Sequence, residues 1–265
     1  WPGHSLGLPQ PHSDKDAKPK SIKEQDKERR QRVRDIDEFF DQAEAYRQGR
    51  KADPEGLGVI PSWEAMMPVL EGKIPLMIHA DEVRQIKAAV EWAEKRKYRM
   101  ILSGGQDAWK LADWLGERKI PVIYHHIFTA PRYRNSPHDE QFRAPGILAK
   151  AGVPLSIGFR LGGWTAANQR NLPYHAAQAV AHGLSRGKAL ASITMEPAKL
   201  AGVSKRLGSL EVGKEATFIA TTGDLLDLRS SVKHMIISGR STSLQSRHTR
   251  LYERYRNRPK PREKP

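Results

Sequence analysis

Residues 74–124 read IPLMIHADEVRQIKAAVEWAEKRKYRMILSGGQDAWKLADWLGERKIPVIY. In this stretch, short apolar runs alternate with segments whose apolar side chains recur at helical spacing. Uninterrupted apolar runs are typical of parallel strands, because these are buried on both faces. The expected elements are a strand at 74–80, a helix at 81–96, a strand at 99–103, a helix at 107–118 and a strand at 120–124.

The same alternation continues towards the C-terminus. A helix is expected at 140–151, and a fourth apolar run at 153–158 predicts another strand. Strands and helices that alternate at this spacing predict βαβ units, a parallel sheet and the α/β class. Further helices are expected at 173–182, 185–194 and 196–201.

The flanking segments have a different character. Upstream, a loop and a charged linker lead into an expected helix at 35–50, and a short helix follows at 63–70. Downstream, glycines punctuate two β-like runs at 216–221 and 232–238. These runs predict a small antiparallel unit.

The composition is that of a globular protein with a modest core. Of the 265 residues 38% are hydrophobic, and cysteine is absent, which excludes disulfides and cysteine-based zinc sites. No stretch approaches the roughly 18 to 20 continuous apolar residues of a membrane span. The chain opens with Trp1, without a signal-peptide pattern and without an initiator Met. We therefore expect a soluble protein with a longer parent, for which the sequence leaves the compartment open, export included.

The net charge of +15 is concentrated in two polar flanks. Residues 247–265 hold eight Lys or Arg and two Glu, a net of +6, and residues 14–35 hold nine basic and six acidic residues, a net of +3. Such runs are usually solvated and poorly ordered. Tyr252 and Tyr255 lie in the basic tail, but no known binding module surrounds them, so we expect no specific nucleic-acid partner.

Three motifs carry a resemblance to a known family. Residues 183–214 read GLSRGKALASITMEPAKLAGVSKRLGSLEVGK, in which a T-x-x-P-A turn at Thr194 precedes G-S-L-E-x-G-K. The other two are RNLPYHAA at 170–177 and IHADE at 78–82. Over about residues 60–255 the chain resembles the amidohydrolase superfamily, particularly its imidazolonepropionase-like group.

The resemblance implies the C-terminal half of a TIM-type (β/α)8 barrel with part of an appended small β-sandwich domain. The four expected strands would be the fifth to eighth of the barrel, with the active residues at their C-terminal ends. The predicted domains are an N-terminal loop and charged linker with one helix (1–60), a partial barrel (61–205), a β-sandwich appendage (206–245) and a basic tail (246–265).

The resemblance also implies metal chemistry. Enzymes of this family use divalent metal ions to activate water and to polarise the scissile carbonyl group. The implied ligands are a His-x-His pair on the first strand, a Lys or Glu on the fourth, a His on each of the fifth and sixth, and an Asp on the eighth. That Asp also serves as the general base. We expect zinc in the complete protein, whereas this chain alone could lack a metal.

His79 fits the fifth-strand ligand position, because it follows the apolar run at a strand end. A histidine there can also have a purely structural role. His125, which follows the expected strand at 120–124, is a second candidate metal ligand. Adjacent residues on a strand face opposite sides, so at most one of His125 and His126 would face the barrel interior. Either could instead be a solvated rim residue.

Two implied ligands are missing. The sixth strand ends in Ser103, Gly104 and Gly105, without a histidine, and the eighth runs into Phe159 and Arg160, without an Asp. The glycines could present backbone N–H groups to an anion, or they could simply form a tight turn. The positive charge of Arg160 disfavours a metal and favours an anion.

The loop after the last strand holds the candidate substrate-binding residues. They are Arg160, Asn168, Arg170 and Asn171. The asparagines could instead cap the helix that follows.

Two functions remain in view at this point. One is a metal-dependent hydrolase acting on a non-peptide C–N bond, such as that of a cyclic amide, in the complete parent. The other is a catalytically inactive relative that keeps the fold as a binding or scaffold protein. The expected partners are a small-molecule substrate and, for a half-barrel, a second copy of the chain.

Overall fold

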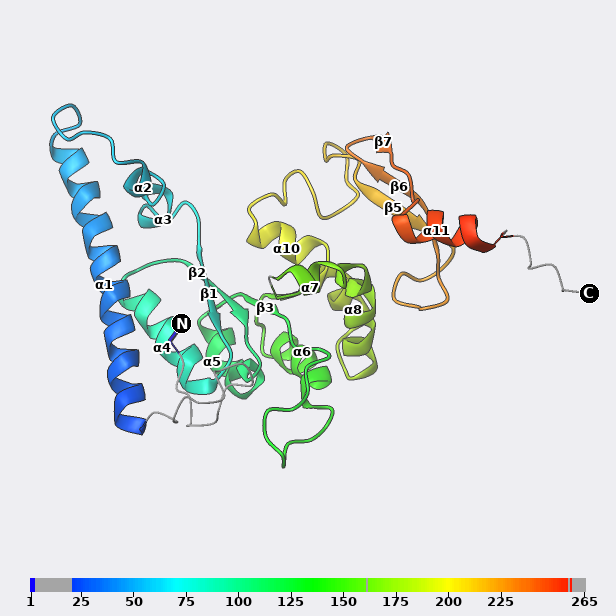
Figure 1. Cartoon of the computed structure of the whole chain (residues 1–265), viewed down its shortest axis with the longest axis horizontal. Coiled ribbons are helices and arrows are strands. Elements are labelled where there is room, and N and C mark those ends of the chain that lie inside the picture. The colour runs from blue at the N-terminus through cyan, green and yellow to red at the C-terminus, as the bar shows by residue number, and fades with distance from the viewer. Residues whose placement is uncertain (3–20, 161, 257, 259–265) are drawn as a thin grey trace, which may run out of the picture. The chain divides into compact units, whose positions relative to one another are not determined.

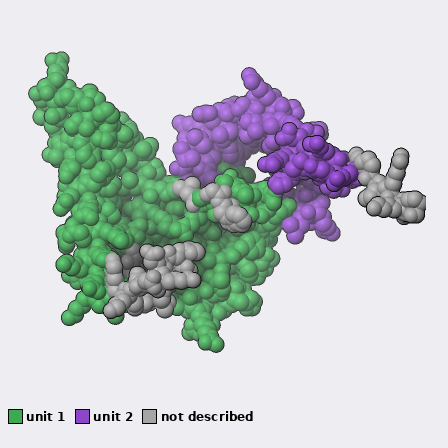
Figure 2. Space-filling view, in the orientation of Figure 1, with its two compact units in different colours: residues 1–196 green, residues 197–265 purple. Residues whose placement is uncertain are grey.

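The computed structural model describes residues 1–2, 21–160, 162–256 and 258. The chain divides into two compact units, residues 1–196 and 197–265, which are coloured separately in Figure 2. No helix of the described residues is long and apolar enough to cross a membrane.

A parallel sheet lies at the centre of the first unit (Figure 1). Its four strands lie side by side in chain order, which confirms the prediction of a parallel sheet. The register places His79 opposite Ser103 and Tyr124 opposite Ile157. The strands are β1 (Leu76–Ala80), β2 (Met100–Gly104), β3 (Val122–Tyr124) and β4 (Leu155–Ile157).

Helices connect the strands and cover the sheet. Helix α4 (Val83–Lys95) buries Ile86 and Val90, while Leu102 and Val122 in the strands are fully buried. These apolar contacts form the core that holds the strand ends in place. The other elements of this unit are α2 (Pro61–Glu64), α3 (Met67–Leu70), η1 (Ala108–Leu111), α5 (Ala112–Glu117), α6 (Glu140–Lys150), α7 (Gly163–Ala166), η2 (Gln169–Asn171), α8 (Leu172–Ala181), α9 (Arg186–Ser192) and α10 (Met195–Leu200), which extends past residue 196.

The first helix, α1 (Ile22–Ala52), is longer than predicted. We expected a helix only over 35–50, so the prediction of a charged linker is wrong for residues 22–34, while residues 3–20 lie outside the described residues. The helix begins early because Ser21 and Glu24 form a reciprocal capping box. An ion pair of 2.7 Å between Arg29 and Asp26 also supports its first turns.

An aromatic cluster attaches α1 to α4. The ring of Phe40 lies 5.1 Å from that of Trp92 and 5.3 Å from that of Tyr98. The carboxylate of Asp37 accepts a hydrogen bond of 2.8 Å from the Trp92 indole and pairs with Arg96. Helix α1, most of whose residues are polar, is thus held against α4 by this cluster and by the contacts of Asp37.

The second unit contains a three-stranded antiparallel sheet, as the glycine-punctuated runs predicted. Its strands are β5 (Phe218–Thr221), β6 (Val232–Ile237) and β7 (Arg240–Ser241). Ser238 and Gly239, both with positive φ, form the two-residue turn between β6 and β7. The described residues form one sheet here, so a β-sandwich remains a prediction for the complete protein.

The basic tail is also more ordered than predicted. Helix α11 (Arg247–Arg256) occupies its first half, where we expected a solvated, poorly ordered segment. The guanidinium group of Arg256 lies over the ring of Tyr252, one turn away on the helix. The rest of the tail, except Arg258, lies outside the described residues.

The sheet of the first unit ends in two edges, β1 and β4, to which no further strand of the described residues is paired. Met77 on β1 is 58% exposed, and Ile74 just before it is 48% exposed. Unpaired strand edges recruit other chains. We therefore predict that the isolated 265-residue chain dimerises, aggregates or needs further strands paired to these two edges to be stable.

Light scattering combined with thermal unfolding of the isolated chain tests this prediction. The expected result is a species larger than a monomer. A monodisperse monomer with one cooperative transition would show that the two edges are closed in some other way.

Candidate functional site

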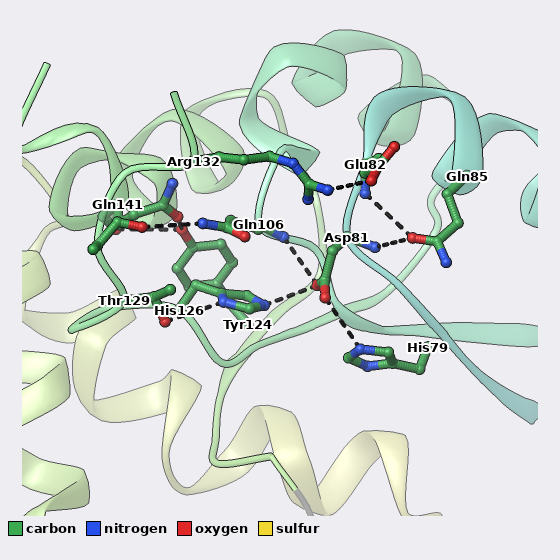
Figure 3. A network of polar contacts seen from close by, with 11 residues as sticks. His79, Asp81, Glu82, Gln85, Gln106, Tyr124, His126, Thr129, Arg132 and Gln141 are labelled. Atoms are coloured by element: carbon green, nitrogen blue, oxygen red, sulfur yellow. Dashed lines mark hydrogen bonds and ion pairs between the residues drawn. The ribbon is translucent and has the colours of Figure 1, made fainter. Parts of the chain in front are cut away.

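The candidate site lies where the C-terminal ends of β1, β2 and β3 meet. His79 lies on β1, and Asp81 follows directly after that strand. Gln106 follows β2, and His126 follows β3. Parallel strands bring their carboxyl ends to the same edge of a sheet, so three loops meet at this point. Figure 3 shows the two histidines on opposite sides of the Asp81 carboxylate.

The carboxylate of Asp81 contacts all three strand ends. Its Oδ1 atom accepts a hydrogen bond of 2.8 Å from His126 Nε2, and its Oδ2 atom lies 3.1 Å from His79 Nε2. The backbone N–H of Gln106 donates a longer bond of 3.4 Å to Oδ1. We call Asp81, His79, His126 and Gln106 the Asp81 cluster.

Asp81 is held in its charged form. Burial raises the pKa of this carboxyl group, but the hydrogen bond and charge of His126, the charge of His79 and the Gln106 N–H outweigh burial and lower the pKa to about 2. A carboxylate that is mostly shielded from water is stable only when it is paired and hydrogen-bonded. The two imidazoles supply that pairing.

Gly104, at the end of β2, makes room for this pair. A Cβ atom at this position would lie 2.5 Å from Asp81 Oδ1 and 2.7 Å from His79 Cε1. Its φ of 100° also lies in the region that favours glycine. Glycine is therefore required here both by the backbone and by the side chains packed against it.

A second layer of hydrogen bonds holds the cluster from outside. The backbone N–H of Asp81 donates 2.8 Å to Gln85 Oε1, which fixes the start of α4. On the other side, His126 Nδ1 lies 3.1 Å from the hydroxyl of Thr129. Both nitrogens of His126 are thus engaged. Arg132 pairs with Glu82 at the rim of the same loop.

His125 lies beside the cluster but outside its hydrogen bonds. Burial, reinforced by His126 and His79, lowers the pKa of His125 to about 4, so its ring is neutral at pH 7. The positive charge of Arg160 acts on it in the same direction, which places Arg160 near this ring. The Nδ1 atom of His125 is buried and has no hydrogen-bond partner among the described residues.

The other candidate substrate-binding residues lie at the turn before α8. Asn168, Arg170 and Asn171 lie on or beside η2, as expected for the loop after the last strand. Asn171 takes the N-cap position of α8, but its side chain makes no capping hydrogen bond. The capping role that the sequence suggested for it is therefore wrong, and its amide stays a candidate for substrate contacts.

The residues present do not by themselves fit a metal ion. No three His, Asp or Glu side chains of the described residues are arranged to hold one. The two histidines of the cluster, His79 and His126, both direct Nε2 at Asp81. A metal in the complete protein would therefore need ligands from elsewhere.

Sequence reasoning found His79 but missed its partners. Asp81 was interpreted only as the start of a helix, although a His and an Asp two residues apart at a strand end were a usable signal. The alternation argument for His125 and His126 does not apply, because β3 ends at Tyr124 and both histidines lie in the following loop. The structure joins His126, rather than His125, to His79 through Asp81.

Comparison with known proteins decides the family. The sequence pattern of the amidohydrolase family matches residues 64–242, more than half of the chain. The chain belongs to the amidohydrolase family. The narrower likeness to imidazolonepropionase remains a prediction.

Solved structures agree with this assignment. An amidohydrolase from Thermotoga maritima MSB8 is 25% identical with a TM-score of 0.69, over 78% of this chain and 54% of that one. A prolidase complexed with N-methylphosphonate-L-proline is 21% identical with a TM-score of 0.52, over 70% of this chain and 50% of that one, and it supports the fold alone. The chain thus spans about half the length of these structures. A comparison with curated proteins gave no match.

The charge of Asp81 predicts a pH-dependent stability. Because the pKa of Asp81 is about 2 in the folded chain and ordinarily 3.8, its ionised form stabilises the fold above pH 3.8, and this contribution is lost as the pH falls towards 2. Asp81→Asn should lower the free energy of unfolding by about 2 kcal/mol at pH 7. The difference in the free energy of unfolding between Asp81→Asn and the wild type should become smaller below pH 4.

Denaturant unfolding of both proteins at several pH values measures this difference. Asp113→Asn, which changes an exposed carboxylate on α5, is the matched control and should change stability little. Equal stability of Asp81→Asn and the wild type at pH 7 would contradict the pairing described above.

Proposed function

We propose that the complete protein is a metal-dependent hydrolase of a non-peptide C–N bond, such as the bond of a cyclic amide, with zinc as the metal. Membership of the amidohydrolase family supports this proposal. The observation that carries it is the placement of His79 at the C-terminal end of a barrel-type strand, with 38% of its side chain exposed.

In such an enzyme, residues of this chain would bind and orient the substrate. The ring of His125 is neutral and half-buried, so it suits an uncharged polar group better than an ion. Arg160 is exposed and carries a positive charge after β4, where it can contact an acceptor oxygen of the substrate. Asn168, Arg170 and Asn171 extend this polar rim.

A second candidate is a non-catalytic relative that keeps the fold as a binding or scaffold protein. The specific observation in its favour lies inside the chain. Strand β2 ends in Ser103 and Gly104, and β4 is followed by Gly158 and Phe159, so the implied His and Asp are absent from both strand ends. Residues outside this chain do not change these two positions.

Metal analysis of the complete protein separates the two candidates. Stoichiometric zinc that is lost in His79→Ala supports the hydrolase and makes His79 a ligand. His138→Ala, which changes an exposed loop histidine, is the matched control and should keep the metal. A folded, metal-free protein supports the second candidate. An unchanged zinc content in His79→Ala would contradict the assignment of His79 as a ligand.

The 265-residue chain by itself should not hydrolyse amides, hydantoin-like rings or esters in a metal-dependent way. It lacks a group of metal ligands among the described residues, and an Asp at the end of β4. Loss of a general base alone typically costs a factor of roughly 10² to 10⁴ in rate. Assays of the purified chain with and without added zinc measure this, and metal-stimulated turnover well above background would contradict it.

A further inference from the structure

Helix α11, near the C-terminus of the chain (Figure 1), exposes both cationic and aromatic side chains to solvent. No residue of this helix is buried, and Leu251 is the one that is partly covered. Its two tyrosines, Tyr252 and Tyr255, are 62% and 56% exposed. Tyrosine combines a large apolar ring with a polar tip and is enriched where proteins contact partners. Two exposed tyrosines on one short helix therefore indicate a contact surface.

Three arginines lie along one face of α11. Arg247, Arg250 and Arg254 are spaced by three and four residues, the spacing of neighbours on a helix surface. All three are exposed, and none forms an ion pair with a described residue. The acidic residue of the helix, Glu253, pairs instead with Arg256 at 2.9 Å. We call Arg247, Arg250 and Arg254 the arginine face, whose uncompensated charge favours an anionic partner.

The two tyrosines lie close to arginines of the same helix. The guanidinium carbon of Arg254 lies 5.8 Å from the ring centre of Tyr255, and that of Arg256 lies 5.5 Å from the ring centre of Tyr252. These distances are typical of cation–π contacts, which hold each ring beside a positive charge. A partner that carries both anionic groups and flat rings can therefore contact both kinds of side chain together.

Two kinds of large anionic partner bind basic helices, namely nucleic acids and anionic membranes. The side chains of α11 favour the first. A helix that lies on a membrane needs an apolar face, whereas the one aliphatic side chain of α11 is Leu251, which is partly covered. The helix holds four arginines and no lysine, and the guanidinium group matches the geometry of a phosphate. Exposed aromatic rings stack on the bases of single strands.

We propose that α11 binds single-stranded nucleic acid without base specificity. The arginine face contacts phosphates, while Tyr252 and Tyr255 stack on unpaired bases, which a duplex does not offer. Neither kind of contact distinguishes one base from another, in agreement with the expected absence of a sequence-specific nucleic-acid partner. The proposal is independent of the hydrolase activity, because α11 belongs to the second unit and the Asp81 cluster to the first.

Fluorescence anisotropy of a labelled oligothymidylate of about 15 nucleotides tests this proposal with the 265-residue chain. The expected dissociation constant is about 10⁻⁴ to 10⁻⁶ M at physiological salt, as for other non-specific binding. Because none of the side chains concerned is buried, their replacement should leave the fold intact. Circular dichroism of each variant checks this.

The tyrosine variants test stacking. Tyr252→Ala should weaken binding of the single strand at least about fivefold, since stacking on one aromatic ring contributes that much or more. Binding of a duplex of the same length should not change, because its bases are already stacked. Tyr252→Phe, which keeps the ring, should bind the single strand as the wild type does. An equal loss for single strand and duplex in Tyr252→Ala would contradict stacking.

The arginine variants test the phosphate contacts. In the double variant Arg250→Gln, Arg254→Gln, the slope of log K against log salt concentration should become less steep by roughly 1.4, because each phosphate contact on a single strand contributes roughly 0.7. The double variant Arg229→Gln, Arg240→Gln is the matched control, since it removes the same charge from exposed arginines of the second unit outside α11. The control should keep the wild-type slope. Equal changes in the two double variants would contradict the assignment to α11.

Two further probes separate nucleic acid from other anionic partners. Sedimentation with vesicles that contain anionic lipid measures membrane binding, and polyglutamate measures attraction by charge alone. The chain should bind the oligonucleotide more tightly than either probe at the same concentration of negative charge. Tighter binding of vesicles or of polyglutamate would overturn the proposal, and so would the absence of measurable binding to the oligonucleotide.

Discussion

The charged carboxylate of Asp81 is the interaction on which the carboxyl end of the sheet depends. It is mostly shielded from water, with 20% of its side chain exposed, and it binds groups from the ends of three strands. A buried charge is tolerated only where partners satisfy it, so each partner becomes necessary once the charge is in place. The loops after β1, β2 and β3 are thereby fixed relative to one another, and a backbone hydrogen bond of 2.8 Å from the Asp107 N–H to the Asp81 carbonyl adds to this for the first two.

The sheet makes this arrangement possible. The register that sets Ala80 opposite Gly104 brings the chain after β1 over a residue without a side chain. Asp81 and His79 occupy the space that a side chain at position 104 would fill. The family fold thus supplies the convergence of strand ends, while one glycine determines which side chains can meet there.

The fold was largely predictable from the sequence because its signals are local. Apolar runs gave the four strands, and helical spacing gave α4 and α6 within a few residues. The start of α1 was not predicted because its many charged residues are typical of a linker, whereas the capping box at Ser21 stabilises the first turn of the helix. For the same reason α11 was expected to be unstructured.

The site was predictable only in part. His79 follows from its place at a strand end, but the pairing of Asp81 with His126 joins residues 45 positions apart in the chain. Such a contact depends on strand order, which periodicity does not give. The rule of alternating faces also failed for His125 and His126, since it holds within a strand and β3 ends before them.

The central claim is that a carboxylate, and not a metal ion, holds the strand ends of this chain together. Thermal unfolding of the 265-residue chain with and without a chelator tests it most directly. The account predicts the same melting temperature in EDTA and in buffer, and no increase on addition of zinc. A melting temperature that falls in EDTA and returns with one equivalent of zinc would contradict it.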